Sequence, residues 1–407
     1  MSELTQATPS IATRLDRVRP FRVVQVLERA QALARDGMDV IHLEVGEPDF
    51  PTPAPIVEAG AQALRDGATR YTPALGIAPL REAIAGHYAA LGIAVAPERV
   101  IVTNGASGAL TLAAALLLDP GDELLLPDPG YPCNQVFAEL VGGRPVPLPV
   151  DATNAYQPLP EAVRSAWTGR TRALLVASPS NPSGSMLTDA ALQALLAVTR
   201  SQGGRLIVDE IYQGLVFGDR RCHGSALALA DDLLVINSFS KYFAMTGWRL
   251  GWMVLPQALV EPVAALAANL FIAPSAPAQQ AALAAFTGNV LALCEQRRAT
   301  LSERREVLLA GLAALGFGVP VSPEGAFYVL ADLTPLGLRG SGPEDNALSG
   351  VSFCSELLEE TGVALTPGID FGDHGTAQLV RFAYTESVPR LKEALRRIEG
   401  FVRQRRR

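Results

Sequence analysis

A cluster of polar residues lies between two apolar stretches near the middle of the chain. Residues 237–252 read NSFSKYFAMTGWRLGW, in which Ser238, Lys241 and Arg249 stand between the strand-like runs LLVIN and LGWMVL. Lysine and arginine are seldom buried without partners. If this connection lies inside the fold, we expect an anionic or electrophilic group beside its two cations.

Polar or small residues also follow four other apolar runs. They stand in NGASGAL with Ala106 and Ser107, DPGYP with Tyr131, SPSNPSG with Asn181, and VDEIY with Asp209 and Tyr212. In an open α/β sheet, ligands bind at the carboxyl ends of the strands, so we expect these side chains to meet at one edge. The NGASGAL segment leads into a helix, whose first amides are free to bind an anion.

Each of these signals has an ordinary explanation when taken alone. NGASG is typical of a turn and helix cap, Asn181 of a turn, and Lys241 of an exposed lysine. The run LIVDE resembles the acidic strand end of a P-loop ATPase, but the chain has no GxxxxGK(S/T) motif, which excludes that site.

Together the residues predict one site for pyridoxal 5'-phosphate (PLP). A helix start, hydroxyls and an arginine suit its phosphate, and an acid suits its ring nitrogen. An asparagine and a tyrosine suit its phenolic oxygen, and a lysine suits its aldehyde.

The elements that must position these residues form an alternating pattern. Strand-like runs cover residues 99–103, 123–127, 144–150, 172–177, 205–209, 233–237 and 250–255, with helical stretches between most of them. Their near-continuous apolar character is typical of strands covered on both faces. The pattern predicts an α/β fold with a mostly parallel sheet.

The pattern changes after about residue 285. A long charged helix, CEQRRATLSERREVLLAGLAALG, is followed by the strand-like runs GAFYVLADL, VALTP and QLVRFAY and by a terminal helix from Pro389. This favours a second, smaller α+β domain. Within it, residues 337–346 (GLRGSGPEDN) are typical of a mobile loop.

Composition excludes several classes of protein. The 407 residues are 49% hydrophobic and 18% charged with a net charge of −7, which indicates a soluble globular protein without nucleic acid or membrane as its main partner. We expect the basic tail, residues 403–407, to be a frayed, solvated helix end. Cysteines 133, 222, 294 and 354 are far apart, so we expect reduced thiols and no metal site. The lack of a signal sequence or a long apolar span predicts a cytoplasmic protein.

Nearly the whole chain resembles the aspartate-aminotransferase-like class I/II aminotransferases of the fold-type I PLP-dependent enzymes. The resemblance is carried by LEVGEPDFPTP (43–53), YTPALGIAPLREAI (71–84), TNGASGAL, SPSNPSG, VDEIY, SFSKYFAMTGWRLGW, GAFYVL and VRFAY. It implies a homodimer whose subunits have a large PLP domain with a seven-stranded sheet (50–285) and a small domain built from both chain ends (1–49 plus 286–407). The activity it implies is ping-pong transfer of an amino group from an L-amino acid to a 2-oxo acid, by way of pyridoxamine phosphate.

The resemblance also implies a role for each residue around the cofactor ring. Lys241 matches the lysine that bonds to the aldehyde of PLP and moves the substrate proton. Asp209 matches the carboxylate at the ring nitrogen, and Tyr131 takes the place of the aromatic residue that stacks on the ring. Asn181 and Tyr212 match the donors to the phenolic oxygen.

At the phosphate, Ala106, Ser107, Ser238 and Arg249 match the residues that bind it, whereas Ser240 receives no role. Tyr71 matches the tyrosine that reaches the phosphate site of the partner subunit.

Arg381 matches the arginine that binds the substrate carboxylate, with Gly46 and Asn181 on the other side; the alternative for it is a salt bridge within the small domain. One departure concerns Ser107, because the aspartate-type branch often has a lysine there that meets a second carboxylate. Dicarboxylic substrates are therefore in question, although Arg22 could supply a cation.

Two other functions compete with amino transfer. A carbon–sulfur lyase that works by β-elimination uses the same scaffold, and it stays open as the alternative. A PLP-sensing transcription regulator needs an added DNA-binding module, whereas this chain reaches LEVGEPDF by residue 50. We therefore do not expect a regulator.

Overall fold

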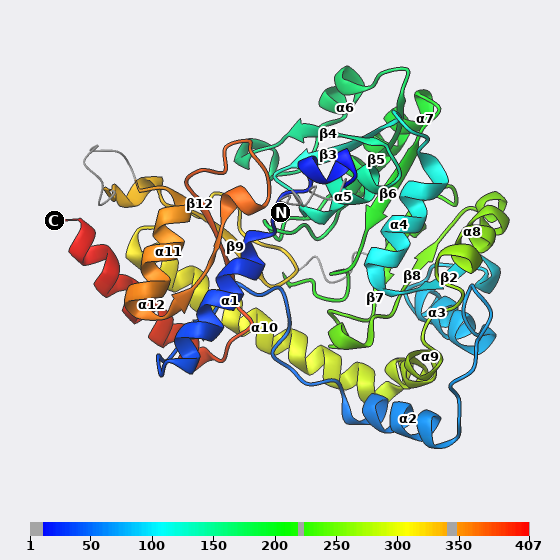
Figure 1. Cartoon of the computed structure of the whole chain (residues 1–407), viewed down its shortest axis with the longest axis horizontal. Helices are drawn as coiled ribbons and strands as arrows, with labels where there is room; N and C mark the ends of the chain where they lie inside the picture. The colour runs from blue at the N-terminus through cyan, green and yellow to red at the C-terminus, as the bar shows by residue number, and fades with distance from the viewer. Residues whose placement is uncertain (1–10, 219–223, 340–347, 407) are drawn as a thin grey trace, which may run out of the picture.

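The computed structural model describes residues 11–218, 224–339 and 348–406 and has two halves (Figure 1). The large half consists of a seven-stranded sheet with helices α2 to α9. The small half contains helix α1 near the N-terminus and helices α11 and α12 near the C-terminus, with strands β9 and β12. The predicted α/β fold class is confirmed.

The large sheet has the strand order β2-β8-β7-β6-β5-β3-β4. Its strands are β2 (Val100–Thr103), β3 (Glu123–Asp128), β4 (Arg144–Pro149), β5 (Thr171–Ala177), β6 (Arg205–Asp209), β7 (Leu234–Ser238) and β8 (Gly251–Val254). Strand β8 runs antiparallel to both of its neighbours, and the other neighbouring strands are parallel. All seven predicted strands are present, each with its ends within one residue of the prediction.

Side chains of both faces of this sheet are buried, which explains the continuous apolar runs. In β6, Leu206 and Val208 belong to one core cluster and Ile207 belongs to the cluster on the other face, because successive side chains point to opposite faces. Helices α3 (Ala78–Ala90), α6 (Pro160–Ala166), α7 (Asp189–Ser201) and α9 (Ala276–Leu283) pack into the first cluster, together with Ile56 of α2 (Ala54–Arg65). Helices α4 (Gly105–Leu117), α5 (Cys133–Leu140) and α8 (Gln257–Leu270) pack into the second.

The small half joins segments from both ends of the chain. Strands β11 (Thr366–Pro367), β12 (Leu379–Ala383) and β9 (Tyr328–Asp332) form an antiparallel sheet, and β1 (Ile41–His42) pairs in parallel with β10 (Val363–Ala364). Its helices are α1 (Arg22–Arg35), α11 (Gly350–Thr361) and α12 (Val388–Arg405).

Helix α10 (Gly288–Leu315) runs from one half to the other (Figure 1). Val290 and Cys294 pack into the core of the large half, whereas Leu301 and Leu308 pack into that of the small half. The division into domains 50–285 and 1–49 plus 286–407 stays a prediction.

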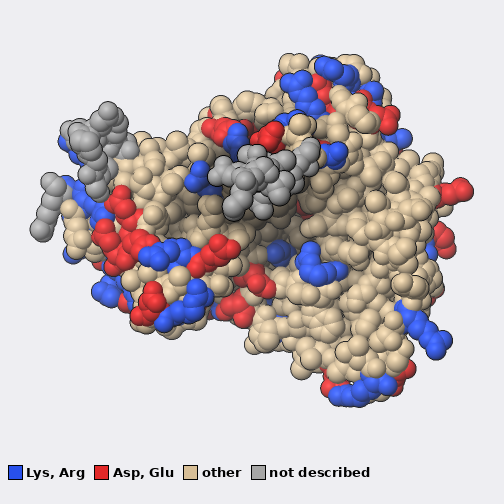
Figure 2. Space-filling view, in the orientation of Figure 1, with Lys and Arg blue, Asp and Glu red and all other residues tan. Residues whose placement is uncertain are grey.

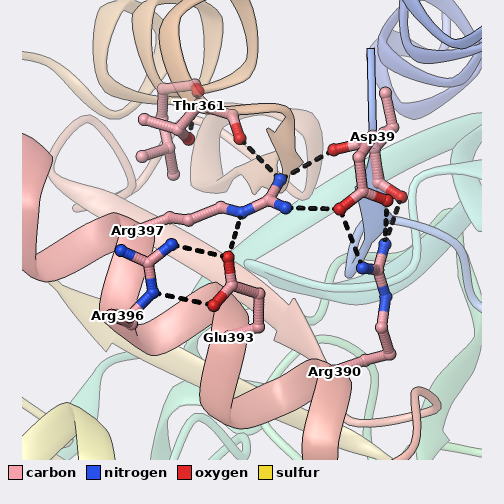
Figure 3. Close-up of polar contacts among 8 residues, drawn as sticks. Asp39, Thr361, Arg390, Glu393, Arg396 and Arg397 are labelled. Carbon is pink, nitrogen blue, oxygen red and sulfur yellow. Dashed lines mark hydrogen bonds and ion pairs between the residues drawn. The ribbon is translucent and has the colours of Figure 1, made fainter. Parts of the chain in front are cut away.

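An ion-pair cluster ties the N-terminal segment to α12 (Figure 3). Arg390 donates two hydrogen bonds to the carboxylate of Asp39, at 2.8 and 2.9 Å, and Arg397 pairs with the same carboxylate. Arg397 also donates to the carbonyl oxygens of Asp39 and Thr361, at 2.7 and 2.9 Å. Hydrogen bonds from the two arginines lower the pKa of Asp39 to about 2. The residues just before β1 are thereby held against the C-terminal helix.

The predicted fraying of the basic tail is wrong as far as Arg405, although the side chain of Arg403 is solvated as predicted, with 74% of it exposed. Helix α12 continues to Arg405, whose side chain is only 14% exposed and pairs with Glu356 and Glu360 of α11. Its guanidinium also lies 3.7 Å from the ring centre of Phe401. Amphipathic packing and ion pairs therefore hold the helix end in place.

Other predictions concern cysteines, metals and membranes. Cys133, Cys294 and Cys354 are free thiols; Cys222 and most of the predicted loop 337–346 lie outside the described residues. Within the described ranges, no cluster of three or more His, Cys, Asp or Glu side chains is arranged to hold a metal ion. None of the helices in those ranges has the length and apolar character to cross a bilayer.

Candidate active site

A cavity of about 300 Å³ lies where parallel strands of the large sheet end. Its wall includes Ala177, the last residue of β5, and Asp209, the last residue of β6. Figure 2 shows a hollow between the two halves of the molecule, with Lys or Arg side chains in and beside it. The described residues that line the cavity are Phe21, Val23, Val24, Leu27, Val45, Gly46, Ala106, Ser107, Leu110, Tyr131, Ala177, Asn181, Asp209, Ile211, Tyr212, Ser240, Lys241, Arg249, Tyr328 and Arg381.

Lys241 follows β7 and reaches into this cavity. Its Nζ donates a hydrogen bond to the carbonyl oxygen of Gly46, 2.6 Å away. Burial lowers the pKa of the Lys241 amine to about 8; the negative charge of Glu47 opposes this shift, and the positive charges of Arg381 and Arg249 add to it. A larger share of the amine is therefore uncharged near neutral pH than in an ordinary lysine, and an uncharged amine can attack an aldehyde.

Asp209 places a buried carboxylate at the end of β6. Its Oδ1 accepts a hydrogen bond from the backbone N–H of Ile211, at 3.0 Å. Burial raises the pKa of Asp209 to about 6, against the opposing effects of that N–H and of Lys241. The group is therefore mainly a carboxylate at pH 7, and it could hold a protonated ring nitrogen.

Two tyrosine hydroxyls meet across the two halves. Tyr212 follows β6 and Tyr328 begins β9, and their hydroxyl oxygens are 2.9 Å apart. Burial raises the pKa of both phenols, so both hydroxyls stay protonated and available as donors. The sequence prediction included Tyr212 and missed Tyr328, although its signal was present as the tyrosine of GAFYVL.

Arg381 is buried in the middle of β12. Its guanidinium carbon lies over the rings of Tyr328 and Phe371, 4.2 and 4.7 Å from their centres. Nη1 donates to Oδ1 of Asn181 at 2.9 Å, and Nη2 donates to the carbonyl oxygen of Glu44 at 2.5 Å. Its Nε is buried without a hydrogen-bond partner. Among the described residues, no carboxylate lies within ion-pair distance of the Arg381 guanidinium. The alternative of a salt bridge within the small half is therefore not what the structure shows.

The start of α4 and the loop before β8 approach each other closely at one end of the cavity. Ala106 and Ser107 lie in the first turn of α4, and Arg249 faces them. Gly105 has a φ of +69°, and a Cβ there would lie 2.9 Å from the Arg249 Nη2. Arg249 itself has a φ of 54°, which is unusual for a residue other than glycine. Helix-start amides, a hydroxyl and a guanidinium that converge in this way fit a phosphate group.

The structure brings ten of the twelve predicted site residues to the cavity wall, but Ser238 and Tyr71 are not among the lining residues. Ser238 is buried at the end of β7, where its Oγ lies 2.8 Å from the Oγ of Ser240. Ser240, for which the family resemblance implied no role, lines the cavity in its place. Tyr71 is 88% exposed.

Sequence reasoning also missed the apolar wall formed by residues around α1. Phe21, Val23, Val24 and Leu27 line the cavity although they stand more than 200 residues before Lys241. The only available signal was the apolar spacing of a helix near the N-terminus, which is typical of any packed helix.

Comparison with known proteins identifies the family. Residues 38–398 match the family model described as aminotransferase class I and II. The chain belongs to this family. The aminotransferase is 36% identical over 386 residues to the valine–pyruvate aminotransferase of Mycobacterium tuberculosis, covering 95% of this chain and 97% of that one. It is 36% identical over 390 residues to the aspartate/prephenate aminotransferase of Thermus thermophilus, covering 95% and 97%.

Solved structures agree with this assignment. An aminotransferase from Mycobacterium tuberculosis matches with a TM-score of 0.91 at 36% identity, over 98% of this chain and 100% of that one. The aspartate aminotransferase from Thermus thermophilus with maleate matches with a TM-score of 0.87 at 36% identity, over 97% and 100%. The predicted family, fold type I and amino-group transfer are confirmed, and the carbon–sulfur lyase gains no support. Class I and II aminotransferases use PLP.

Proposed function

We propose that the cavity binds PLP and that Lys241 bonds to its aldehyde. One observation carries this proposal. The chain has only two lysines, and Lys241 lies in the cavity with a lowered pKa, whereas Lys392 is exposed on α12. An enzyme that needs an amine at the cofactor therefore has one candidate in each chain.

The donors around Lys241 fit the polar groups of the PLP ring. Asp209 would face the ring nitrogen, and Tyr131 would stack on the ring. Because Oδ1 of Asn181 accepts from Arg381, its Nδ2 is left to donate to the phenolic oxygen. Tyr328 can donate to Tyr212, which leaves the hydroxyl of Tyr212 free to donate to that oxygen as well.

The phosphate would lie at the start of α4. Ala106 and Ser107 would offer backbone amides and a hydroxyl, and Arg249 a charged fork. Of the two serines that end and follow β7, Ser240 lines the cavity and Ser238 does not. Ser238 would hold Ser240 in position, since the backbone N–H of Ser240 donates to the Ser238 Oγ at 3.1 Å.

The chemistry follows from these positions. When bound, PLP supplies an electron-accepting ring that takes the electron pair left at the substrate Cα after its proton departs. Lys241 would move that proton, because it lines the cavity and the lowered pKa of its amine lets it accept and release a proton near neutral pH. Arg381 would hold the substrate carboxylate, and the partner-free Nε shows that its hydrogen-bonding capacity is not used up within the protein. Gly46 would lie on the other side, with Val45.

We also propose a homodimer in which Tyr71 completes the phosphate site of the partner subunit. Its 88% exposure would be unusual for a tyrosine in a single subunit, and an exposed aromatic with a polar tip suits an interface.

The proposal is tested by a half reaction with matched lysine variants. Wild type, Lys241→Ala and Lys392→Ala, each loaded with PLP, are mixed with an amino acid in the absence of an oxo-acid acceptor, and the released 2-oxo acid is measured. We expect wild type and Lys392→Ala to release about one oxo acid per site. Lys241→Ala should lose at least about 100-fold in rate, since it lacks the group that transfers the proton.

Retained activity in Lys241→Ala would overturn the assignment of Lys241. Pyruvate and ammonia produced catalytically from cysteine under the same conditions would instead indicate the lyase.

A further inference from the structure

The part of the cavity wall that is formed by the start of α1 is apolar. Phe21, at the start of α1, and Val23, Val24 and Leu27 of its first two turns line the cavity. Their spacing is that of one helix face, because residues three and four apart lie side by side. Val45, Leu110 and Ile211 continue the apolar surface from other segments.

The cations of the cavity wall are accounted for. Among the described lining residues they are Lys241, Arg249 and Arg381. The function proposed above uses them for the aldehyde, the phosphate and the substrate carboxylate. None of the described lining residues remains to meet a second carboxylate with a positive charge, and position 107, which lines the same cavity, is serine.

Arg22, the candidate for such a cation, is turned elsewhere. Arg22 and Gln25 line a neighbouring cavity of about 490 Å³ and are not among the residues that line the active-site cavity. The orientation is fixed at the start of α1, where the backbone N–H groups of Arg22 and Val23 donate to the carboxylate of Asp370, at 2.8 and 3.2 Å. With the backbone held there, Val23, Val24 and Leu27 line the active-site cavity, whereas Arg22 and Gln25 line the neighbouring one.

Ion pairs keep the preceding segment in the same place. Arg17 pairs with Glu139 of α5 at 2.6 Å, and Arg19 pairs with Asp373 at 2.7 Å. The apolar wall is thus attached to both halves of the molecule.

We infer that this aminotransferase takes amino acids with large apolar side chains in preference to aspartate or glutamate. The inference rests on the proposed function, in which Arg381 holds the α-carboxylate. A large apolar side chain gains free energy by contact with this wall in proportion to the area removed from water. A side-chain carboxylate would lose its hydration there without a cation to replace it.

The inference is tested with wild-type holoenzyme. The half reaction is measured with leucine, methionine, phenylalanine, alanine, aspartate and glutamate, and kcat/KM is compared. We expect the best large apolar amino acid to exceed both acidic ones by about 100-fold and to exceed alanine by about tenfold. An acidic amino acid that equals or exceeds the best apolar one would overturn the inference. Failure with every amino acid would instead overturn the proposed function.

A pair of variants on adjacent positions of α1 tests the wall itself. Val24→Arg places a cation on the face that lines the cavity, at a position that is already 44% exposed and tolerant of a polar side chain. We expect it to raise the aspartate-to-leucine ratio of kcat/KM at least about tenfold. The control Gln25→Arg adds the same charge on the face toward the neighbouring cavity and should leave that ratio unchanged. An unchanged ratio in Val24→Arg, or an equal change in both variants, would contradict the role of this wall.

Discussion

Lys241 is one of only two lysines in the chain. The other 32 of its 34 Lys and Arg residues are arginines. Arginine stays charged at all accessible pH values, whereas a buried lysine can lose its proton near neutrality. The hydrogen bond to the Gly46 carbonyl orients the Lys241 amine but leaves its lone pair available when the amine is uncharged. This protein therefore has one basic side chain suited to attack an aldehyde and later to move a proton.

The lowered pKa of Lys241 predicts how fast apoenzyme takes up PLP at different pH values. With a pKa of about 8 the amine is protonated and unreactive at low pH, and it becomes reactive as the pH rises through 8. At pH 7 about one-tenth is uncharged, far more than for a lysine of ordinary pKa. We expect the uptake rate, followed by absorbance in a stopped-flow instrument, to be half-maximal near pH 8 and to level off above pH 9.

Lys392→Ala serves as the control and should give the same profile, since its side chain lies on the exposed face of α12. A rate that still rises steadily at pH 10 would show that burial does not lower the pKa of Lys241.

At the scale of elements, the strands and the residues that end them could be predicted from the sequence. Ala177 and Asp209 end neighbouring strands, so the polar residues that follow them had to meet at one edge of the sheet. The direction of β8 could not be predicted, because an apolar run looks the same in a parallel and an antiparallel strand.

Contacts between elements far apart in the chain were also beyond sequence reasoning. Tyr328 meets Tyr212 only because β9 of the small half packs against the loop after β6. Asp370 accepts from the first amides of α1 across nearly 350 residues, and this contact decides which face of the helix lines the cavity. Ser240 replaces Ser238 at the wall because the chain turns sharply after β7, which motif matching does not reveal.

At the scale of the whole molecule, the site depends on both halves. The large half contributes Lys241 and Asp209, and the small half contributes Arg381 and Tyr328. The loop with Gly46 runs between them and is anchored by Asp49, whose carboxylate accepts two hydrogen bonds from Arg304 of α10, at 2.7 and 2.9 Å. Movement of one half against the other would therefore change the distance between the lysine and the carboxylate-binding arginine.

The proposed dimer predicts a defined effect of the Tyr71 hydroxyl. We expect wild type to sediment as a dimer and Tyr71→Phe to remain dimeric while it binds PLP about tenfold more weakly, because one hydrogen bond to a charged phosphate is lost. Dissociation constants can be measured by titration of apoenzyme with PLP. A monomeric wild type with full activity, or a Tyr71→Phe variant of unchanged affinity, would contradict the proposed role of Tyr71.

Lys241 is the residue that we expect to hold the cofactor. Holoenzyme treated with sodium borohydride, which fixes PLP irreversibly to the amine it is bonded to, can be digested and its peptides weighed by mass spectrometry. With two lysines in the chain, the outcome is unambiguous. We expect one phosphopyridoxyl group per chain, on the peptide that contains Lys241. A holoenzyme labelled on Lys392 alone, or labelled on neither lysine, would contradict this assignment.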